Sequence, residues 1–195
     1  MNRALDVLVA GAALALTSPL LVTAAVAIKL DTRGPVFYRH GRVGARGVPF
    51  ELWKLRTMVV GAEHIGAGLY IEDRDPRITR AGRLLRRFSL DELPNLFNVL
   101  QGDMAIVGPR PTVQVQVDRY TPRQRRRLEV RPGITGWAQV NGRTTLSWPE
   151  RIELDVWYVD NRSLALDLRI LARTVKLLAT GQGLYSSELE QGWGD

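Results

Sequence analysis

The 195-residue sequence predicts an α+β fold, in which a small domain of helices and one β-hairpin follows a long apolar segment. Residues 7–28 form a run of 22 residues without a charge. Two short strand-like runs then flank a turn at residues 44–47, and two later helices have clear start signals. We therefore expect an apolar segment over residues 1–30, a folded domain over 31–185 and a flexible tail over 186–195.

The apolar segment is long enough to cross a bilayer, at about 33 Å if it is helical throughout. Ser18-Pro19 lies near its middle, where the proline removes one helical hydrogen bond and the serine hydroxyl can bond to the freed carbonyl. Arg3 precedes the segment and Lys29 and Arg33 follow it, so both ends favour the cytoplasmic side. A bent, re-entrant helix meets both demands; a cleaved signal peptide and a single crossing are the alternatives.

Residues 35–56 predict two strands joined around residues 44–47. Lys54 and Arg56 share one face of the second strand at a spacing of about 7 Å, which suits two phosphate groups. A solvated basic edge is the alternative. Residues 61–75 contain three glycines and few periodic apolar residues, a composition typical of a mobile loop.

Residues 89–111 (SLDELPNLFNVLQGDMAIVGPRP) combine an acidic pair with a helix start. Pro94 fits only the first turn of a helix, because it has no N–H to donate. Asp91 and Glu92 then lie at or just before the helix N-terminus, where free N–H groups and the helix dipole stabilise carboxylates and phosphates. The alternative is an ordinary capping box between Ser89 and Glu92, with no catalytic role.

Arg110 follows this helix between two prolines, which fix the backbone and reduce the entropy that the side chain loses on binding an anion. Upstream, arginines recur at positions 74, 77, 80, 83 and 86 and form a basic segment that leads into the acidic pair. We expect most of these to be surface charges.

Residues 118–131 are rich in charge and include an arginine cluster at 123, 125, 126 and 127. A solvated helix face and a contact with anionic lipid head groups are the two interpretations of this cluster. Residues 134–140 predict a buried strand. Asn141-Gly142 then predicts a turn that presents Arg143.

The C-terminal part predicts two helices. Ser147 and Glu150 form a capping-box pattern that opens a helix toward Asn161. A last helix carries an apolar stripe that packs on a core or lies amphipathically in the membrane interface; the stripe comprises Leu164, Leu168, Leu171, Val175 and Leu178.

The composition limits the function classes. A net charge of +7 predicts attraction for anions, whether lipid head groups, phosphorylated substrates or nucleic acid. The absence of cysteine excludes disulfides, thiolate nucleophiles and cysteine-ligated zinc. His40 and His64 are the only histidines, and the sequence has neither a G-x-S-x-G motif nor a Walker loop, which argues against a soluble hydrolase. A membrane-tethered anion-binding module is the main rival to an enzyme.

Four sequence blocks carry a family resemblance: residues 50–58 (FELWKLRTM), 89–111, 131–143 (RPGITGWAQVNGR) and 154–170 (LDVWYVDNRSLALDLRI). In this order they resemble the bacterial sugar transferase family, the monotopic phosphoglycosyl transferases of surface-glycan assembly, in its minimal form. The resemblance implies transfer of a phosphosugar from a nucleotide diphosphate sugar, expected to be a UDP-sugar, to polyprenol phosphate. It also implies Mg²⁺, an aspartyl intermediate and a place on the cytoplasmic face of the bacterial inner membrane.

The resemblance also implies roles for individual residues. Asp91 would be the nucleophile and the Mg²⁺ ligand, with Asp103 a weaker metal candidate, and Glu92 would accept a proton or help to fix the metal. Ser18-Pro19 matches the break of the family's re-entrant segment. Anionic phospholipids would be additional partners, nucleic acid would not, and a homodimer is compatible with the sequence. The residues expected to bind substrate phosphate are Lys54, Arg56, Arg86, Arg110 and Arg143.

Overall fold

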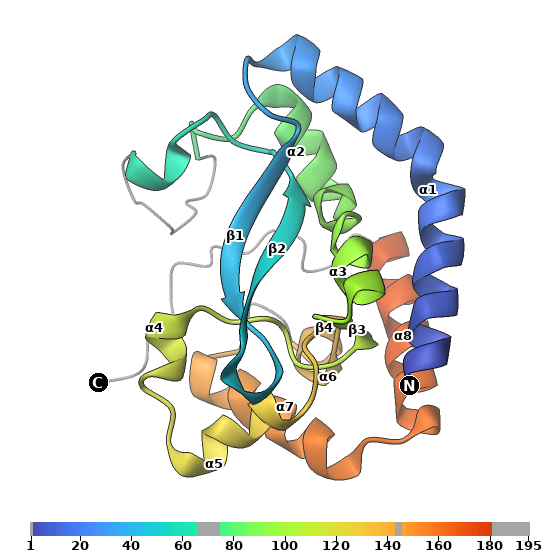
Figure 1. The fold of residues 1–195 in the computed structure, drawn as a ribbon, viewed down its shortest axis with the longest axis vertical. Helices are drawn as coiled ribbons and strands as arrows, with labels where there is room; N and C mark the ends of the chain where they lie inside the picture. The colour runs from blue at the N-terminus through green and yellow to red at the C-terminus, as the bar shows by residue number, and fades with distance from the viewer. Residues whose placement is uncertain (1, 66–74, 143–145, 181–195) are drawn as a thin grey trace.

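A computed structural model of the chain describes residues 2–65, 75–142 and 146–180 (Figure 1). Helix α1 (Arg3–Asp31) runs along one side of the domain. Helix α3 (Asn95–Gln101) contacts both α1 and the β-hairpin, so it lies between them. The predicted mixture of helices with a small amount of strand is confirmed. The expected tail and most of the expected 61–75 loop lie outside the described residues.

Helix α1 continues through Pro19, and Figure 1 shows it bent along its length, so one bent helix replaces the expected break between two helices. Pro19 has no N–H for the carbonyl of Ala15, four residues earlier. The hydroxyl of Ser18 donates to that oxygen at 2.9 Å, as the sequence predicts. Because the freed carbonyl has a partner, the bend is compatible with an apolar environment.

Both ends of α1 are fastened to the domain. Near its start, Arg3 donates to the main-chain oxygen of Leu100 at 2.8 Å, and the buried carboxylate of Asp6 accepts from the main chain of Ile106 at 3.1 Å. At its end, Asp31 accepts from the main chain of Ala81 at 2.8 Å. The outer face of the helix exposes large apolar side chains, among them Leu8, Leu16, Val22 and Leu30.

The predicted hairpin is confirmed. Strands β1 (Phe37–Val43) and β2 (Pro49–Leu55) pair antiparallel, with the short helix η1 (Ala45–Gly47) at the connection. Leu52 and Leu55 of β2 are buried, so this strand carries the contact with the domain core.

A second, parallel pair joins β3 (Ala105–Val107) to β4 (Gly133–Thr135). The segments approach so closely that a Cβ atom on Gly133 would lie 2.1 Å from the main-chain nitrogen of Gly108, which only glycine avoids. The expected strand over residues 134–140 is wrong beyond Thr135, because the chain turns at Gly136 into helix α6 (Trp137–Val140). A short apolar run does not distinguish strand from helix by its pattern.

The remaining elements support the core. Helix α7 (Trp148–Asn161) begins at the predicted capping box of Ser147 and Glu150, which is confirmed. Met104, Val99 and Ile170 are fully buried in the central cluster. The shorter elements are η2 (Ala62–His64), α2 (Arg80–Arg87), η3 (Leu90–Glu92), α4 (Gln114–Val117), α5 (Pro122–Arg125) and η4 (Arg126–Glu129).

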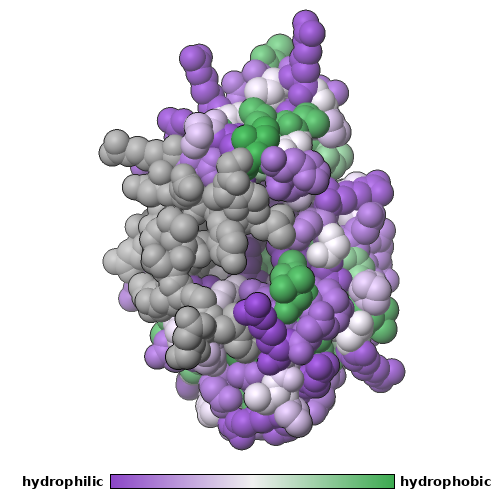
Figure 2. Space-filling model, turned by 90° about the vertical axis from the view of Figure 1, so that its left-hand side faces the viewer, coloured by the Kyte–Doolittle hydropathy of each residue, from purple (hydrophilic) through white to green (hydrophobic). Residues whose placement is uncertain are grey.

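Helix α8 (Leu164–Thr180) packs through Leu166 and Ile170. Most of the predicted stripe points elsewhere: Leu168 and Val175 are 57% and 67% exposed, and only Leu171 packs against the core. Figure 2 views the side opposite α1, and there the described surface is mostly hydrophilic. The exposed apolar side chains of α1 therefore face away from this hydrophilic side.

Candidate active site

A tight turn presents the acidic pair. Helix α2 ends at Arg87, and Ser89 adopts a left-handed backbone conformation with φ 54° before η3 begins. Such a conformation at a residue other than glycine costs about 1–3 kcal/mol and tends to occur at functional sites. Ser89 makes no capping hydrogen bond through its side chain, so the capping-box alternative is wrong. The side chain of Glu92 instead faces two cations.

Glu92 bridges the hairpin and the Arg110 loop. Its Oε1 atom lies 2.8 Å from Nζ of Lys54 and 2.7 Å from Nη2 of Arg110. Burial opposes ionisation of Glu92, but the charges and hydrogen bonds of Arg110 and Lys54 outweigh it and hold its pKa well below the ordinary value. Glu92 is therefore an ionised group that fixes two cations in place.

Asp91 has a different environment from its neighbour. The residue is only 9% exposed, and this burial raises its pKa above the ordinary value. The positive charge of Lys54 opposes the rise, the negative charge of Glu92 adds to it, and Arg86 on α2 opposes it. Asp91 is thus a poorly solvated carboxylate with a raised pKa that feels the charges of Lys54 and Arg86, which suits a nucleophile that attacks phosphorus.

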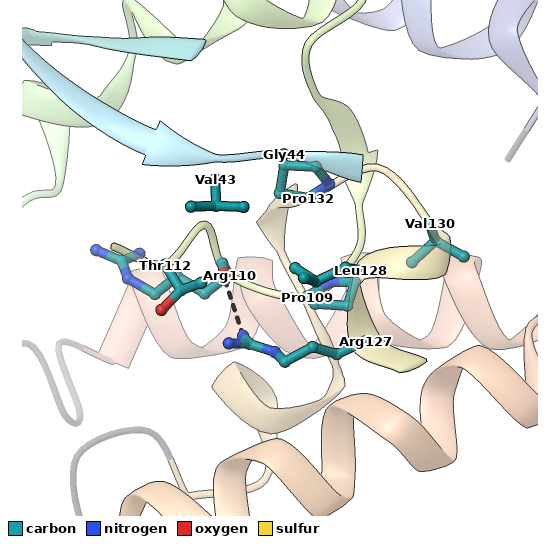
Figure 3. A pocket seen from close by; sticks show the side chains of 9 residues that line it. All are labelled: Val43, Gly44, Pro109, Arg110, Thr112, Arg127, Leu128, Val130 and Pro132. Carbon is teal, nitrogen blue, oxygen red and sulfur yellow. Dashed lines mark hydrogen bonds between the residues drawn. The ribbon is translucent and has the colours of Figure 1, made fainter. Parts of the chain in front are cut away.

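The loop that carries Arg110 is fastened from below (Figure 3). Arg127 donates to the main-chain oxygen of Arg110 at 2.9 Å. Arg127 is itself buried and forms an ion pair with Asp155 of α7 at 2.6 Å. The interpretation of the arginine cluster as a solvated helix face is therefore wrong for Arg127. Its long-range carboxylate partner makes the burial tolerable.

Other members of the arginine cluster are tied to α7 by exposed ion pairs. Arg123 pairs with Glu153, and Arg126 pairs with Asp160 and Glu129. These two arginines fit the solvated-face interpretation. Their carboxylate partners offset the charge that a lipid head group would meet.

Arg56 lies apart from the acidic pair and has a structural role. Its side chain is 5% exposed, and its guanidinium donates to the main-chain oxygens of Thr32, Arg33 and Pro35 just after α1. With its donors used in this way, Arg56 is not available to substrate phosphate. The sequence prediction for Arg56 is thus not supported by its surroundings, whereas Lys54 lies at the site as expected.

Comparison with known proteins decides the family. The sequence profile described as bacterial sugar transferase matches residues 1–181. The chain belongs to the bacterial sugar transferase family. It is 45% identical over 187 residues to a protein of Bacillus subtilis (strain 168) named uncharacterized sugar transferase EpsL, with 96% of this chain and 91% of the relative covered.

Two further relatives have named activities. The chain is 44% identical over 193 residues to the UDP-glucose:undecaprenyl-phosphate glucose-1-phosphate transferase of Caulobacter vibrioides, covering 94% of this chain and 72% of the relative. It is 42% identical over 189 residues to the UDP-N-acetylgalactosamine-undecaprenyl-phosphate N-acetylgalactosaminephosphotransferase of Aeromonas hydrophila. That match covers 94% of this chain but 44% of the relative, so the chain spans less than half of that protein.

The structure of this sugar transferase brings together most of the residues singled out by sequence. Lys54, Arg86 and Arg110 surround Asp91 and Glu92. Arg143 lies outside the described residues. Asp103 follows the opposite end of α3, where it accepts from Nδ2 of Asn98 at 3.3 Å, so it is not grouped with the acidic pair.

An Mg²⁺ ion at this site would need substrate phosphates to complete its ligands. Within residues 2–65, 75–142 and 146–180, no three acidic, histidine or cysteine side chains cluster as metal ligands. Mg²⁺ commonly takes one or two carboxylates and completes its shell with substrate phosphates and water. Asp91 fits this mode of binding, whereas both oxygens of Glu92 already face cations.

Sequence reasoning missed two residues at the site. Arg42 and Asn95 line a small pocket together with Glu92 and Arg110. Asn95 is the first residue of α3, after the N-cap Pro94, where a polar residue is ordinary, and Arg42 lies in β1, whose residues alternate between exposed and partly buried. Neither pattern distinguishes a site residue from a structural one.

Proposed function

We propose that this bacterial sugar transferase moves a phosphosugar from a UDP-sugar to polyprenol phosphate, through a covalent intermediate on Asp91. The products would be polyprenol diphosphate sugar and UMP, in the first membrane step of surface-glycan synthesis. The buried Asp91 beside a cation-bound Glu92 is the observation that carries the proposal. The names of the Caulobacter and Aeromonas relatives, which specify UDP-sugars and undecaprenyl phosphate, support it.

In the first step, a carboxylate oxygen of Asp91 attacks the phosphorus that bears the sugar. The bond from this phosphorus to the bridging oxygen breaks, and UMP leaves with the electron pair. Arg86 and Arg110 would neutralise the charge that develops on the phosphate oxygens. Mg²⁺, when bound by Asp91 and the diphosphate, would supply further neutralisation.

In the second step, a phosphate oxygen of the polyprenol phosphate attacks the same phosphorus, and the bond to Asp91 breaks to restore the carboxylate. Glu92 is poorly suited to accept a proton, because its pKa is held well below the ordinary value. We assign it a positioning role, in which it holds Lys54 and Arg110 beside the nucleophile. The sequence left open whether Glu92 accepts a proton or helps to fix the metal, and the positioning role replaces the first of these.

The placement of α1 supports a monotopic arrangement. α1 is long and apolar enough to cross a membrane, and the described part of the chain contains one such helix. However, contacts at Arg3, Asp6 and Asp31 fasten both of its ends to the same domain. An ordinary crossing would separate these ends by the bilayer thickness. We infer that α1 enters one leaflet with its exposed apolar face and returns, with the domain on the cytoplasmic side.

The exposed stripe of α8 supports a second membrane contact. Leu164, Leu168, Val175 and Leu178 are 42–67% exposed and share one side of the helix. Ala10 of α1 and Ile170 of α8 belong to one core cluster, so the two helices are parts of a single packed unit. We infer that α8 lies in the interface beside the α1 segment.

A turnover assay tests the proposed function. The purified protein in lipid discs would be incubated with Mg²⁺, polyprenol phosphate and a panel of UDP-sugars, and UMP release would be measured. We expect UMP with at least one sugar, and Asp91→Asn to lower the rate by roughly 10³-fold or more. Asp118→Asn, which changes an exposed carboxylate, is the matched control. An anion-binding module would release no UMP and would bind anions as well or better after Asp91→Asn.

A further inference from the structure

The side chain of Asn95 carries an unsatisfied acceptor next to the acidic pair. The residue is 3% exposed, and its Oδ1 atom is fully buried without a hydrogen-bond partner within the described residues. Buried carbonyl groups in folded proteins nearly always have a partner, since leaving one unpaired costs the hydrogen bond that it made with water. An exception beside a site therefore identifies an acceptor that a ligand group can complete.

The pocket around Asn95 limits what this ligand group can be. Its walls combine the charged Arg42, Glu92 and Arg110 with the apolar side chains of Leu52 and Met104. The enclosed volume is ≈ 10 Å³, which is about the space that one water molecule requires. A hydroxyl group or an amide N–H fits this space, whereas a sugar ring or a base does not.

Few other side-chain acceptors in the pocket could receive a hydrogen bond from the ligand. The carboxylate oxygens of Glu92 accept from Lys54 and Arg110, so they are already engaged by stronger, charged donors. The side chains of Leu52 and Met104 offer no oxygen acceptor. Among the side chains that line the pocket, Asn95 therefore carries the acceptor that can receive a neutral O–H or N–H from a ligand.

We propose that Asn95 is a specificity-determining residue, whose Oδ1 atom accepts a hydrogen bond from a hydroxyl or acetamido N–H of the donor sugar. This inference rests on the proposed function. Glu92, which lines the same pocket, is the sequence neighbour of Asp91 and acts on its pKa, and the first ring substituents lie within a few bonds of the phosphorus that Asp91 attacks. A site that hydrogen-bonds a substrate O–H or N–H rejects the analogue that lacks it much more strongly than an apolar pocket does.

The test compares Asn95→Leu, which keeps the branched shape of the side chain but has no acceptor, with Asn95→Asp, which retains an acceptor oxygen. Thermal unfolding would be followed without ligand and with UDP, UDP-glucose or UDP-N-acetylgalactosamine. Measuring these shifts in an Asp91→Asn background isolates binding from turnover. For the sugar that binds, UMP release by the otherwise native enzyme would be measured with the UDP-sugar and with its mono-deoxy or deacetamido analogues.

We expect Asn95→Leu to remain folded without ligand, because removal of an unpaired buried carbonyl offsets part of the cost of the larger methyl groups. Its kcat/KM for the UDP-sugar should fall about 5- to 150-fold, which corresponds to the ~1–3 kcal/mol cost of a missing hydrogen-bond partner. With the native enzyme, the analogue that lacks the bonded group should show a similar fall in kcat/KM relative to the UDP-sugar. With Asn95→Leu, this analogue should show no further fall. Binding of UDP alone should be unchanged, and Asn95→Asp should retain the preference among analogues.

Three outcomes would overturn the inference. The first is an equal kcat/KM for Asn95→Leu and the native enzyme, and the second is an equal fall in kcat/KM with every analogue. The third is a fall in UDP binding as large as that in UDP-sugar binding, which would show that Asn95 contacts the nucleotide. If Asn95→Leu does not fold, Asn95→Ala also removes the acceptor and is judged by the same pattern of analogues. Absence of UMP release by the native enzyme would instead contradict the proposed function, and the shifts in unfolding temperature with each UDP-sugar would still decide the role of Asn95.

Discussion

Nη2 of Arg127 donates a hydrogen bond to the main-chain oxygen of Arg110 at 2.9 Å, and through it the buried Asp155 on α7 acts on the site loop (Figure 3). Asp155 is 28 residues from Arg127 in sequence and lies in a different helix. The position of the site arginine thus depends on the packing of α7 against η4. This link connects the stability of the C-terminal half to the chemistry at Asp91.

Asp155→Asn should destabilise the protein by about 3–5 kcal/mol, because it leaves the buried charge of Arg127 without a counter-ion. The double variant Arg127→Met with Asp155→Leu should recover most of that loss, since an apolar pair can replace a buried ion pair. It should not recover activity, because the carbonyl of Arg110 has lost its donor. Thermal unfolding and UMP release measure the two effects.

Arg123→Gln is the control for these variants. It breaks the exposed pair with Glu153 in the same arginine cluster and should change neither stability nor activity appreciably. If the double variant has native kcat/KM, then the bond from Arg127 does not position Arg110.

The pH dependence of the first step should respond in opposite directions to two substitutions near Asp91. The nucleophile must be ionised, and its pKa is raised, so activity should fall on acidification at a pH above the ordinary aspartate range. Glu92→Gln removes a negative charge that raises this pKa, which should move the acid limb to lower pH. Lys54→Met removes a positive charge that lowers it, which should move the limb to higher pH.

UMP release with the UDP-sugar alone measures this profile without titration of the polyprenol phosphate. Asp118→Asn should leave the acid limb unchanged. Shifts in the same direction for Glu92→Gln and Lys54→Met would show that Asp91 is not the titrating group.

The membrane arrangement of α1 can be tested with single cysteines, because the native sequence contains none. Ala4 and Arg33 are exposed residues at the two ends of the helix, and Val115 is an exposed residue of the domain. Ala4→Cys, Arg33→Cys and Val115→Cys should all react with an impermeant reagent from one side of sealed vesicles. Reaction of Ala4→Cys from the opposite side alone would show a single crossing.

Local patterns made much of the fold predictable. The hairpin, the helix that opens at Ser147 and the position of the acidic pair depend on turn, cap and proline preferences that act within a few residues. The bend of α1 belongs to the same class, because Ser18 and Pro19 determine it together. The end of the strand at Thr135 could not be predicted, since the apolar run continues past it.

The burial of two arginines could not be predicted from the sequence. Arg56 and Arg127 look like their exposed neighbours, and their burial depends on partners 21 to 28 residues away along the chain. Asn95 was missed for the converse reason, because a polar residue in the first turn of a helix is ordinary and does not indicate a site. Long-range packing, rather than local preference, decides which of several similar polar residues belong to the active site.

Covalent phosphorylation of Asp91 would leave an adduct that intact-protein mass spectrometry can detect. The protein would be incubated with Mg²⁺ and a UDP-sugar that it turns over, without polyprenol phosphate, and fragmented to locate any adduct. We predict the mass of one phosphosugar on residue 91, its loss when polyprenol phosphate is added, and no adduct with Asp91→Asn. Accumulation of polyprenol diphosphate sugar with no adduct on residue 91 at any time would contradict the account.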